Sequence, residues 1–182
     1  MQNPRRAINE LAMEIKKSNQ NLAKIKTMIK DLIKIPIEPN TRIYRGRTLM
    51  HYAVTGNNSG VISLLSKIGV SVNLCDDNFN TPLHFAVLHK AYYSVCELIK
   101  IDGIDLNAPG EFDQTPLHKA VIVGNLDIIK LLINAGADPL MVDEKNQSPL
   151  DYAKDEGDEK IINYLVEITN RQKGGNIWLS IL

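Results

Sequence analysis

Histidine and cysteine are the residues of this sequence whose chemistry could serve metal binding or acid–base catalysis. The chain has four histidines and two cysteines: His51, His84, His89, His118, Cys75 and Cys96. A zinc site needs several such ligands at close spacing, and neither a CxxC nor an HxxxH pattern occurs. Two cysteines are too few for a disulfide framework and favour a reducing compartment. The sequence therefore predicts no metal site, and no cofactor is expected.

Motifs for other kinds of catalysis are also missing from the sequence. It contains no G-x-S-x-G, no P-loop and no G-x-G-x-x-G. Its acidic cluster, Asp155, Glu156, Asp158 and Glu159, lacks the spacing of an EF-hand and indicates a solvated turn. The chain is therefore expected not to be an enzyme and not to take a small-molecule substrate.

Four similar segments recur at a fixed period and predict the elements that position these side chains. They begin at Thr48, Thr81, Thr115 and Ser148, with spacings of 33, 34 and 33 residues. The best-formed segment reads Thr115-Pro-Leu-His-Lys-Ala120. Thr or Ser caps a helix N-terminus, and Pro fits its first turn. Apolar residues at helical spacing then predict a second helix, so each repeat is a helix pair that must stack on a neighbour.

This pattern resembles the ankyrin repeat family, whose period is about 33 residues with a T-P-L-H-x-A motif. The resemblance implies an all-α solenoid of helix–turn–helix pairs with β-hairpin-like loops. In that family the motif histidine forms hydrogen bonds within its own turn, which would account for three of the four histidines. We expect four repeats, preceded by an N-terminal helix or cap and followed by a tail: residues 1–38 for the cap, 44–76, 77–110, 111–143 and 144–170 for the repeats, and 171–182 for the tail.

Two irregularities stand out among the repeats. The family usually has Gly two residues before the Thr, where φ is positive, but this chain has Gly46, Phe79, Asp113 and Asn146. Phe tolerates that conformation poorly, so either the second turn differs or Phe79 is held there for contact. The second repeat also has one extra residue, which we place near Ala91-Tyr92, between its two helices.

Residues 3–35 predict an amphipathic helix that ends before Pro36. Its apolar residues follow alternating three- and four-residue steps over four heptads. One interpretation is a coiled-coil dimer; the other is a cap helix, or helix pair, docked on the first repeat. The second is favoured because terminal repeats need a cover and no complementary charges flank the seam.

Charge adds a third alternative for the N-terminal region. The formal net charge of the chain is zero, yet residues 1–47 contain eleven Lys/Arg against four Asp/Glu, and the remainder contains ten against seventeen. A basic amphipathic helix can bind an anionic membrane or nucleic acid, although such charges are more often only solvated. After the helices, Lys173-Gly174-Gly175 predicts a helix stop.

The resemblance also implies a concave binding surface made of first helices and hairpin tips. Counting from each Thr or Ser, we expect the partner-binding residues of the helices to be Tyr52, Thr55, Gly56, Phe85, Leu88, His89, Lys119, Ile122, Val123, Tyr152, Asp155 and Glu156. The predicted tips are Asp76, Asp77, Asn78, Phe79, Glu111, Phe112, Asp143, Glu144 and Lys145. Among these, Phe85, Leu88, Ile122 and Val123 are expected to form one exposed apolar surface.

The predicted function is a protein–protein interaction module, an adaptor or steric inhibitor that binds another protein. The chain is expected to be cytoplasmic, because neither a secretory signal nor a stretch of ~20 apolar residues is visible. It is also expected to be a monomer. A homodimeric scaffold through residues 3–35 and a peripheral membrane or nucleic-acid binder are the alternatives. Usage rich in Ile, Asn and Lys is typical of AT-rich genomes, whose ankyrin proteins often resemble effectors delivered into a host cell.

Overall fold

Each predicted Thr or Ser start begins a helix and caps it in the same way. The computed structural model describes residues 4–17, 22–34 and 38–179. In all four repeats, the side chain three positions after the cap residue accepts a hydrogen bond from the backbone N–H of the cap residue. For Thr115 this bond ends on His118 Nδ1 at 3.1 Å, and for Ser148 on Asp151 Oδ2 at 3.0 Å. Because an N–H at the helix start is otherwise unpaired, these capping boxes fix where the helices begin.

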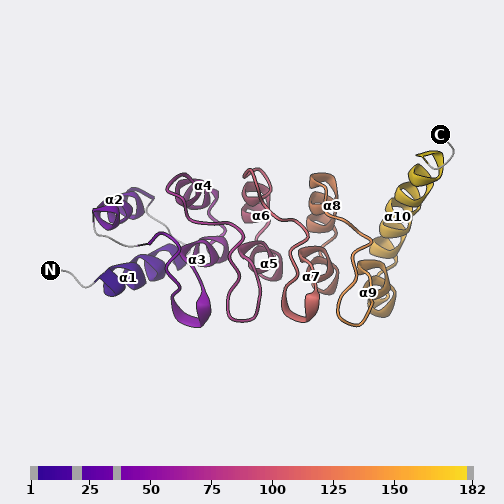
Figure 1. Ribbon diagram of the computed structural model, residues 1–182, viewed down its shortest axis with the longest axis horizontal. Coiled ribbons are helices and arrows are strands. Elements are labelled where there is room, and N and C mark those ends of the chain that lie inside the picture. The colour runs from indigo at the N-terminus through magenta and orange to yellow at the C-terminus, as the bar shows by residue number, and fades with distance from the viewer. Residues whose placement is uncertain (1–3, 18–21, 35–37, 180–182) are drawn as a thin grey trace. The chain divides into compact units, whose positions relative to one another are not determined.

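The chain divides into two compact units, Met1–Asp105 and Leu106–Leu182. In the first unit, one row of helices contains α1, α3 and α5, and a second row contains α2, α4 and α6 (Figure 1). Within the rows α1 packs on α3, α3 on α5, and α4 on α6. Their bounds are α1 Pro4–Lys16, α2 Leu22–Ile33, α3 Leu49–Thr55, α4 Ser59–Lys67, α5 Pro82–Leu88 and α6 Tyr92–Leu98.

The second unit contains two further helix pairs. Helix α7 packs on α8 and on α9, and α9 packs on α10. The core between them includes Leu117, Ile129, Leu132 and Leu165, all fully buried. The bounds are α7 Pro116–Ile122, α8 Leu126–Ala135, α9 Pro149–Glu156 and α10 Glu159–Leu179. The described residues thus form ten α-helices in successive pairs, as predicted for an all-α repeat fold.

A tight loop precedes the first helix of every repeat. It is closed by one backbone hydrogen bond, from Ile43 N–H to Arg47 O in the first repeat and from Asp143 N–H to Gln147 O in the last, at 2.7 and 3.0 Å. Equivalent bonds join Asp76 to Asn80 and Gly110 to Gln114. These loops are the predicted hairpins, although no residue in the described ranges belongs to a β-strand.

The left-handed backbone expected two residues before each Thr or Ser is present in all four repeats. The φ angles are 70° at Gly46, 63° at Phe79, 56° at Asp113 and 59° at Asn146. The second turn therefore does not differ from the others, and Phe79 adopts a conformation that costs a bulky L-residue roughly 1–2 kcal/mol.

The N-terminal region forms two helices, as in the helix-pair form of the predicted cap, and not one continuous helix over 3–35. Helices α1 and α2 pack against each other, α1 also packs on α3, and α2 on α4. Five residues of the heptad seam are buried inside this pair and its contacts with the first repeat: Ile8, Leu11, Ile15, Ile25 and Ile29 are at most 2% exposed. A coiled-coil dimer would need these same side chains, so the cap pair replaces that alternative. The expected boundaries at Asn3 and Pro36 lie outside the described residues.

Two smaller predictions are also wrong. The extra residue of the second repeat does not lie near Ala91-Tyr92, because Lys90 and Gly124 both have positive φ, both follow their Thr by nine residues and both lie two residues before the second helix starts. It lies after α6, since Gly103 follows Thr81 by 22 residues whereas Gly69 follows Thr48 by 21. The predicted stop at Lys173–Gly175 is absent, and α10 continues to Leu179. Glycine costs a helix interior roughly 0.5–1 kcal/mol without ending it.

Candidate functional site

The predicted site residues of the first unit lie at the ends of α3 and α5. Tyr52, Thr55 and Gly56 are half-buried, and the Thr55 hydroxyl donates to the Tyr52 carbonyl at 2.8 Å. Leu88 is 37% exposed, and His89 is also exposed. Burial lowers the pKa of His89, and the positive charges of Arg47 and Lys16 lower it further. The exposed end of α5 is therefore an apolar and cationic surface.

Phe85 does not lie on that surface, and its predicted exposure is wrong. Its side chain is 6% exposed. The His51 ring meets it edge-on at 5.1 Å, the His89 ring stacks at 5.9 Å, and the Arg47 guanidinium lies 4.6 Å from its ring centroid. Phe85 thus packs against the side chains of His51, His89 and Arg47. Replacing it would disturb the fold as well as the surface.

The loop before α5 contains both a buried structural residue and a solvent-exposed tip residue. Asp76 is 4% exposed, and its Oδ1 accepts hydrogen bonds from the backbone N–H groups of Asn78 and Asn80. This is the turn role expected of Asp, so Asp76 is not a surface tip residue. Phe79, by contrast, is 67% exposed.

In the second unit, the predicted helical residues differ in exposure. Ile122 is 36% exposed and Val123 is half-buried. Lys119 is only 7% exposed, and its Nζ lies 6.0 Å from the Phe112 ring centroid. Burial lowers the pKa of Lys119, and Glu111 partly opposes that shift. Phe112 itself is 55% exposed, so it covers the lysine and leaves much of its own ring in solvent.

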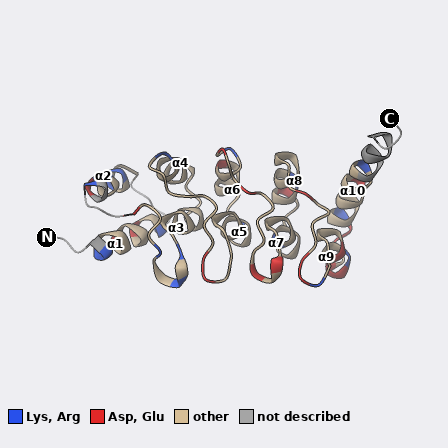
Figure 2. Cartoon of the chain, viewed as in Figure 1, with Lys and Arg blue, Asp and Glu red and all other residues tan. Residues whose placement is uncertain are grey.

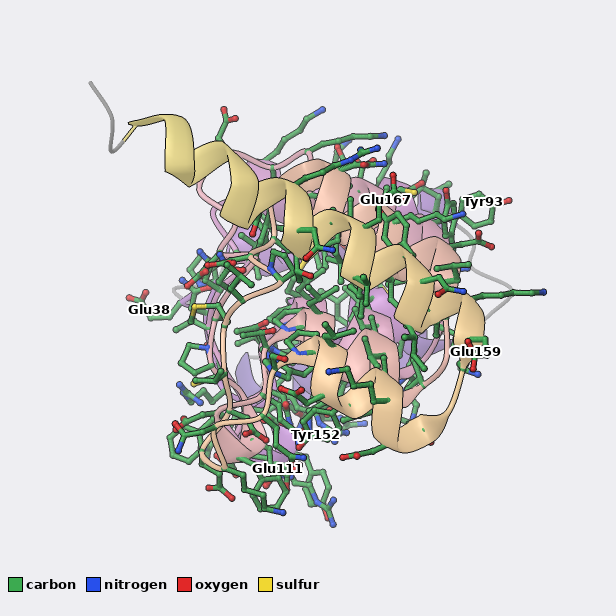
Figure 3. The ribbon with its side chains drawn as sticks, turned by 90° about the vertical axis from the view of Figure 1, so that its right-hand side faces the viewer. Glu38, Tyr93, Glu111, Tyr152, Glu159 and Glu167 are labelled. Carbon is green, nitrogen blue, oxygen red and sulfur yellow. The ribbon has the colours of Figure 1, made fainter. Side chains whose placement is uncertain are left out.

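A polar network surrounds Tyr152 at the hairpin end of the second unit; in the view of Figure 3, Tyr152 and Glu111 are on the lower side and Glu167 is on the upper side. The Tyr152 hydroxyl donates to Asp143 Oδ2 at 2.7 Å and accepts from Gln114 Nε2 at 2.6 Å. Burial raises the pKa of Asp143, but the hydrogen bonds from Tyr152, Gln147 and Lys145 outweigh it and lower the pKa overall. Asp155 is exposed and accepts from Gln147 Nε2 at 3.1 Å.

The sequence did not reveal that motif histidines also join successive repeats. His51 Nε2 lies 3.0 Å from Asn80 O, and His118 Nε2 lies 3.0 Å from Gln147 O. Since Nδ1 accepts the capping N–H, Nε2 must carry the proton and donate to the carbonyl. Asparagines add a second set of links: Asn73 Oδ1 accepts from Asp105 N–H, and Asn107 Oδ1 from Asp138 N–H. Their recurrence 34 residues apart was the available signal.

The loops differ in charge (Figure 2). The loop before α3 contains Arg42, Arg45 and Arg47, whereas Asp and Glu predominate in the loops before α5, α7 and α9. Among the described residues, no group of three or more His, Cys, Asp or Glu is arranged to hold a metal. None of the helices in the described ranges combines the length and apolar character needed to cross a membrane.

Models of ankyrin repeats match most of the chain. A model of three repeat copies matches residues 17–110, and a model of many copies matches residues 98–153. Helix α1 lies outside both matches. Only ankyrin repeats are evident in the chain, and no catalytic domain is identified.

Comparison with individual proteins gives the same result. The chain is 32% identical over 121 residues to an ankyrin repeat protein of fowlpox virus (strain NVSL), FPV223, which covers 66% of this chain and 84% of the viral protein. It is 36% identical over 81 residues to the B-cell lymphoma 3 protein homolog of Mus musculus, covering 43% of this chain and 18% of that protein. It is 34% identical over 125 residues to the nuclear factor NF-kappa-B p105 subunit of Rattus norvegicus, covering 65% and 12%. The chain thus spans under a fifth of each mammalian relative. With four capped helix pairs at a 33-residue period and these matches, the chain belongs to the ankyrin repeat family.

Proposed function

We propose that the chain binds a partner protein through two sets of exposed side chains in its two units. One set lies at the hairpin tips, and the other lies at the ends of the first helices of the repeats. Ankyrin repeats are in general protein–protein interaction modules. The observation that carries the proposal is Phe79: an aromatic ring with 67% exposure on a backbone with φ of 63°. Both features are unfavourable for the isolated chain, and strained exposed residues are often retained for binding.

Further exposed apolar residues support the proposal in each unit. In the first unit they are Tyr44, at 67% exposure, and Leu88; in the second they are Phe112 and Ile122. Aromatic side chains contribute strongly to protein interfaces because they bury a large area at low entropic cost. A binding surface of this kind needs no catalytic group and acts by occupying the partner.

The test replaces the ring without disturbing the fold. Phe79→Gly removes the side chain and suits the left-handed backbone, so the free energy of unfolding should stay level or rise by up to about 1 kcal/mol. Partners captured from a cell extract by the wild-type chain and identified by mass spectrometry should be lost by this variant. Loss of capture with unchanged or increased stability excludes unfolding as the cause.

Tyr93→Ser is the matched control. Tyr93 is 66% exposed on α6 and its ring projects from the second row of helices (Figure 3). It should retain the partners that Phe79→Gly loses. Capture that is equally strong with Phe79→Gly, Phe112→Gly and the wild type would contradict a binding role for the tips.

We further propose that the partner is a protein of a host cell. The composition rich in Ile, Asn and Lys supports this, as does the similarity to viral proteins, including protein R664 of Acanthamoeba polyphaga mimivirus at 33% identity over 61% of that protein. Capture from an animal-cell and an amoebal extract should give tip-dependent partners in at least one. A tip-dependent partner found only among the proteins of the source organism would overturn this finer proposal.

A further inference from the structure

A recessed cavity lies between α1 and the first repeat. Its volume is about 450 Å³, within the range of sites that hold small ligands or side chains. Helix α1 contributes Arg5, Ile8 and Met13, the loop before α3 contributes Arg42 and Tyr44, and α3 contributes Tyr52. The cavity therefore depends on a helix that lies outside the residues matched by the ankyrin models.

The chemistry of the cavity wall is cationic and aromatic, with no acidic side chain in its lining. The Arg42 side chain is fixed, because its Nη1 donates to Cys75 O at 2.8 Å and to Gly46 O at 3.3 Å. A guanidinium has five donors. Those on Nη2 and Nε of Arg42 have no hydrogen-bond partner among the described residues, so they can serve an anionic group.

The lining of the cavity also includes apolar side chains, which restricts the kind of anion it suits. Ile8 is almost fully buried, whereas Met13 is 58% exposed and offers the apolar surface. The Arg45 guanidinium lies 5.4 Å from the Tyr44 ring centroid and extends the cationic surface beyond the cavity. A ligand that matches this lining carries carboxylates beside aliphatic or aromatic groups.

Four basic residues of the helix pair form local ion pairs, whereas Lys16, Lys26 and Lys30 are exposed. Arg6 pairs with Glu10, both Lys17 and Lys24 pair with Glu14, and Lys34 pairs with Asp31. Local ion pairs of this kind weaken the long-range field that draws a chain to nucleic acid. Membrane insertion needs an exposed apolar helix face, yet Leu11, Ile15, Ile25 and Ile29 are buried.

We infer that this cavity is the anchor point for an acidic segment of the partner protein, in which Asp or Glu alternates with apolar side chains. The inference rests on the proposed function, because Tyr52 belongs to the same candidate surface. The carboxylates would bind the Arg5 and Arg42 guanidiniums, and the apolar side chains would cover Met13.

A titration with a defined probe tests the inference. The probe is a short acetylated and amidated peptide of alternating Glu and Leu with one central Phe, added to the full-length ¹⁵N-labelled chain. Backbone amide signals of Asn9, Ile43 and Tyr44 should shift, while those of α8 should not. The same peptide with Gln in place of Glu should bind at least roughly tenfold more weakly, because charge-assisted hydrogen bonds would be lost.

Arg5→Gln should weaken binding of the acidic peptide roughly tenfold. Arg6→Gln is the matched control: it lies on the same helix, removes the same charge, and its side chain pairs with Glu10 outside the cavity lining. Equal losses for the two variants, or equal binding of the Gln peptide, would overturn the inference. So would tighter binding of an oligothymidine, or of phosphatidylglycerol vesicles, that is lost in Arg5→Gln.

Failure of this inference can be separated from failure of the proposed function. If Arg5→Gln leaves peptide binding unchanged while Phe79→Gly still abolishes partner capture, only the cavity assignment fails. If the peptide binds as expected while Phe79→Gly leaves capture intact, the tips are not the binding surface and the cavity stands alone.

Discussion

At the scale of single residues, the motif histidine performs two tasks with two nitrogen atoms. Nδ1 of His51 accepts the Thr48 backbone N–H at 3.1 Å, and Nε2 donates to the Asn80 carbonyl of the following loop. Only the neutral ring can do both, since protonation removes the acceptor. In the last repeat Asp151 replaces this histidine and keeps the capping bond.

These histidines predict that the protein loses stability in mild acid. Burial lowers the pKa of His51 and His118 from the ordinary 6.5, with partial opposition from their carbonyl partners. As pH falls below 6.5, the unfolded chain binds protons that the folded chain excludes, so the free energy of unfolding decreases between pH 6.5 and the lower native pKa values. Urea unfolding at pH 7.5 and 5.5 should show this decrease.

The paired variant His51→Asn/His118→Asn should be less stable at pH 7.5 by about 1–3 kcal/mol per site, because each buried carbonyl loses its donor. It should also lose part of the decrease between the two pH values, while the remaining histidines, buried His84 and His89 with its lowered pKa, retain theirs. The exposed control His89→Asn should change stability by no more than about 0.5 kcal/mol at pH 7.5. A double variant with the wild-type pH dependence would show that other groups cause it.

At the scale of elements, the N-terminal helix pair shows why spacing alone left two alternatives. An apolar residue every three or four positions suits a seam with a second chain and a face packed on the first repeat equally well. The packing of α1 against α2 decides the outcome, because the two halves of the seam face each other within one chain. The Glu14–Lys24 ion pair, at 3.0 Å, then links α1 to α2.

We expect Ile15→Ala to destabilise this pair and not an oligomer. Ile15 is fully buried, so removing its methyl and methylene groups should cost about 2–5 kcal/mol. Hydrogen exchange should accelerate in α1 and α2, and sedimentation velocity should give the same mass for wild type and variant. Met13→Ala, at a 58% exposed position, should alter neither measurement. A wild-type dimer that Ile15→Ala converts to a monomer would restore the coiled-coil alternative.

At the scale of the whole molecule, the chain consists of two units, each with its own buried core. In repeat proteins stability is approximately a sum of repeat and nearest-neighbour contributions. The relevant residues of the second core, such as Leu132 and Leu165, have no exposed surface. Local loss of packing should therefore be felt most within the unit that contains it.

Leu132→Ala tests this division. The substitution should destabilise the protein by about 2–5 kcal/mol because Leu132 is fully buried. Hydrogen–deuterium exchange should increase more in α7, α8 and α9 than in α3 to α6. Leu140→Ala, at a 39% exposed position, provides the control and should leave exchange unchanged. Equal acceleration in both units would mean that the chain unfolds as one cooperative body.

The sequence by itself determined the family, the four helix starts and the left-handed turns at Gly46, Asp113 and Asn146, because these depend on local chemistry; the turn at Phe79 was left open. A Thr or Ser cap, a following Pro and a residue two positions earlier that accepts positive φ act within a few bonds of each other. The lack of metal-ligand or nucleophile motifs was also visible in the sequence, since those motifs have fixed spacings.

Tertiary structure alone decided which side chains are exposed and what the N-terminal seam packs against. Phe85 and Leu88 have similar apolar character, yet one is buried beneath Arg47 and the other faces solvent. Which residues a neighbouring helix covers depends on packing between segments far apart in sequence. The type of a residue does not specify which distant segment packs against it. The cavity at Arg5 and Arg42 belongs to the same class, because two elements that are separate in sequence form its walls.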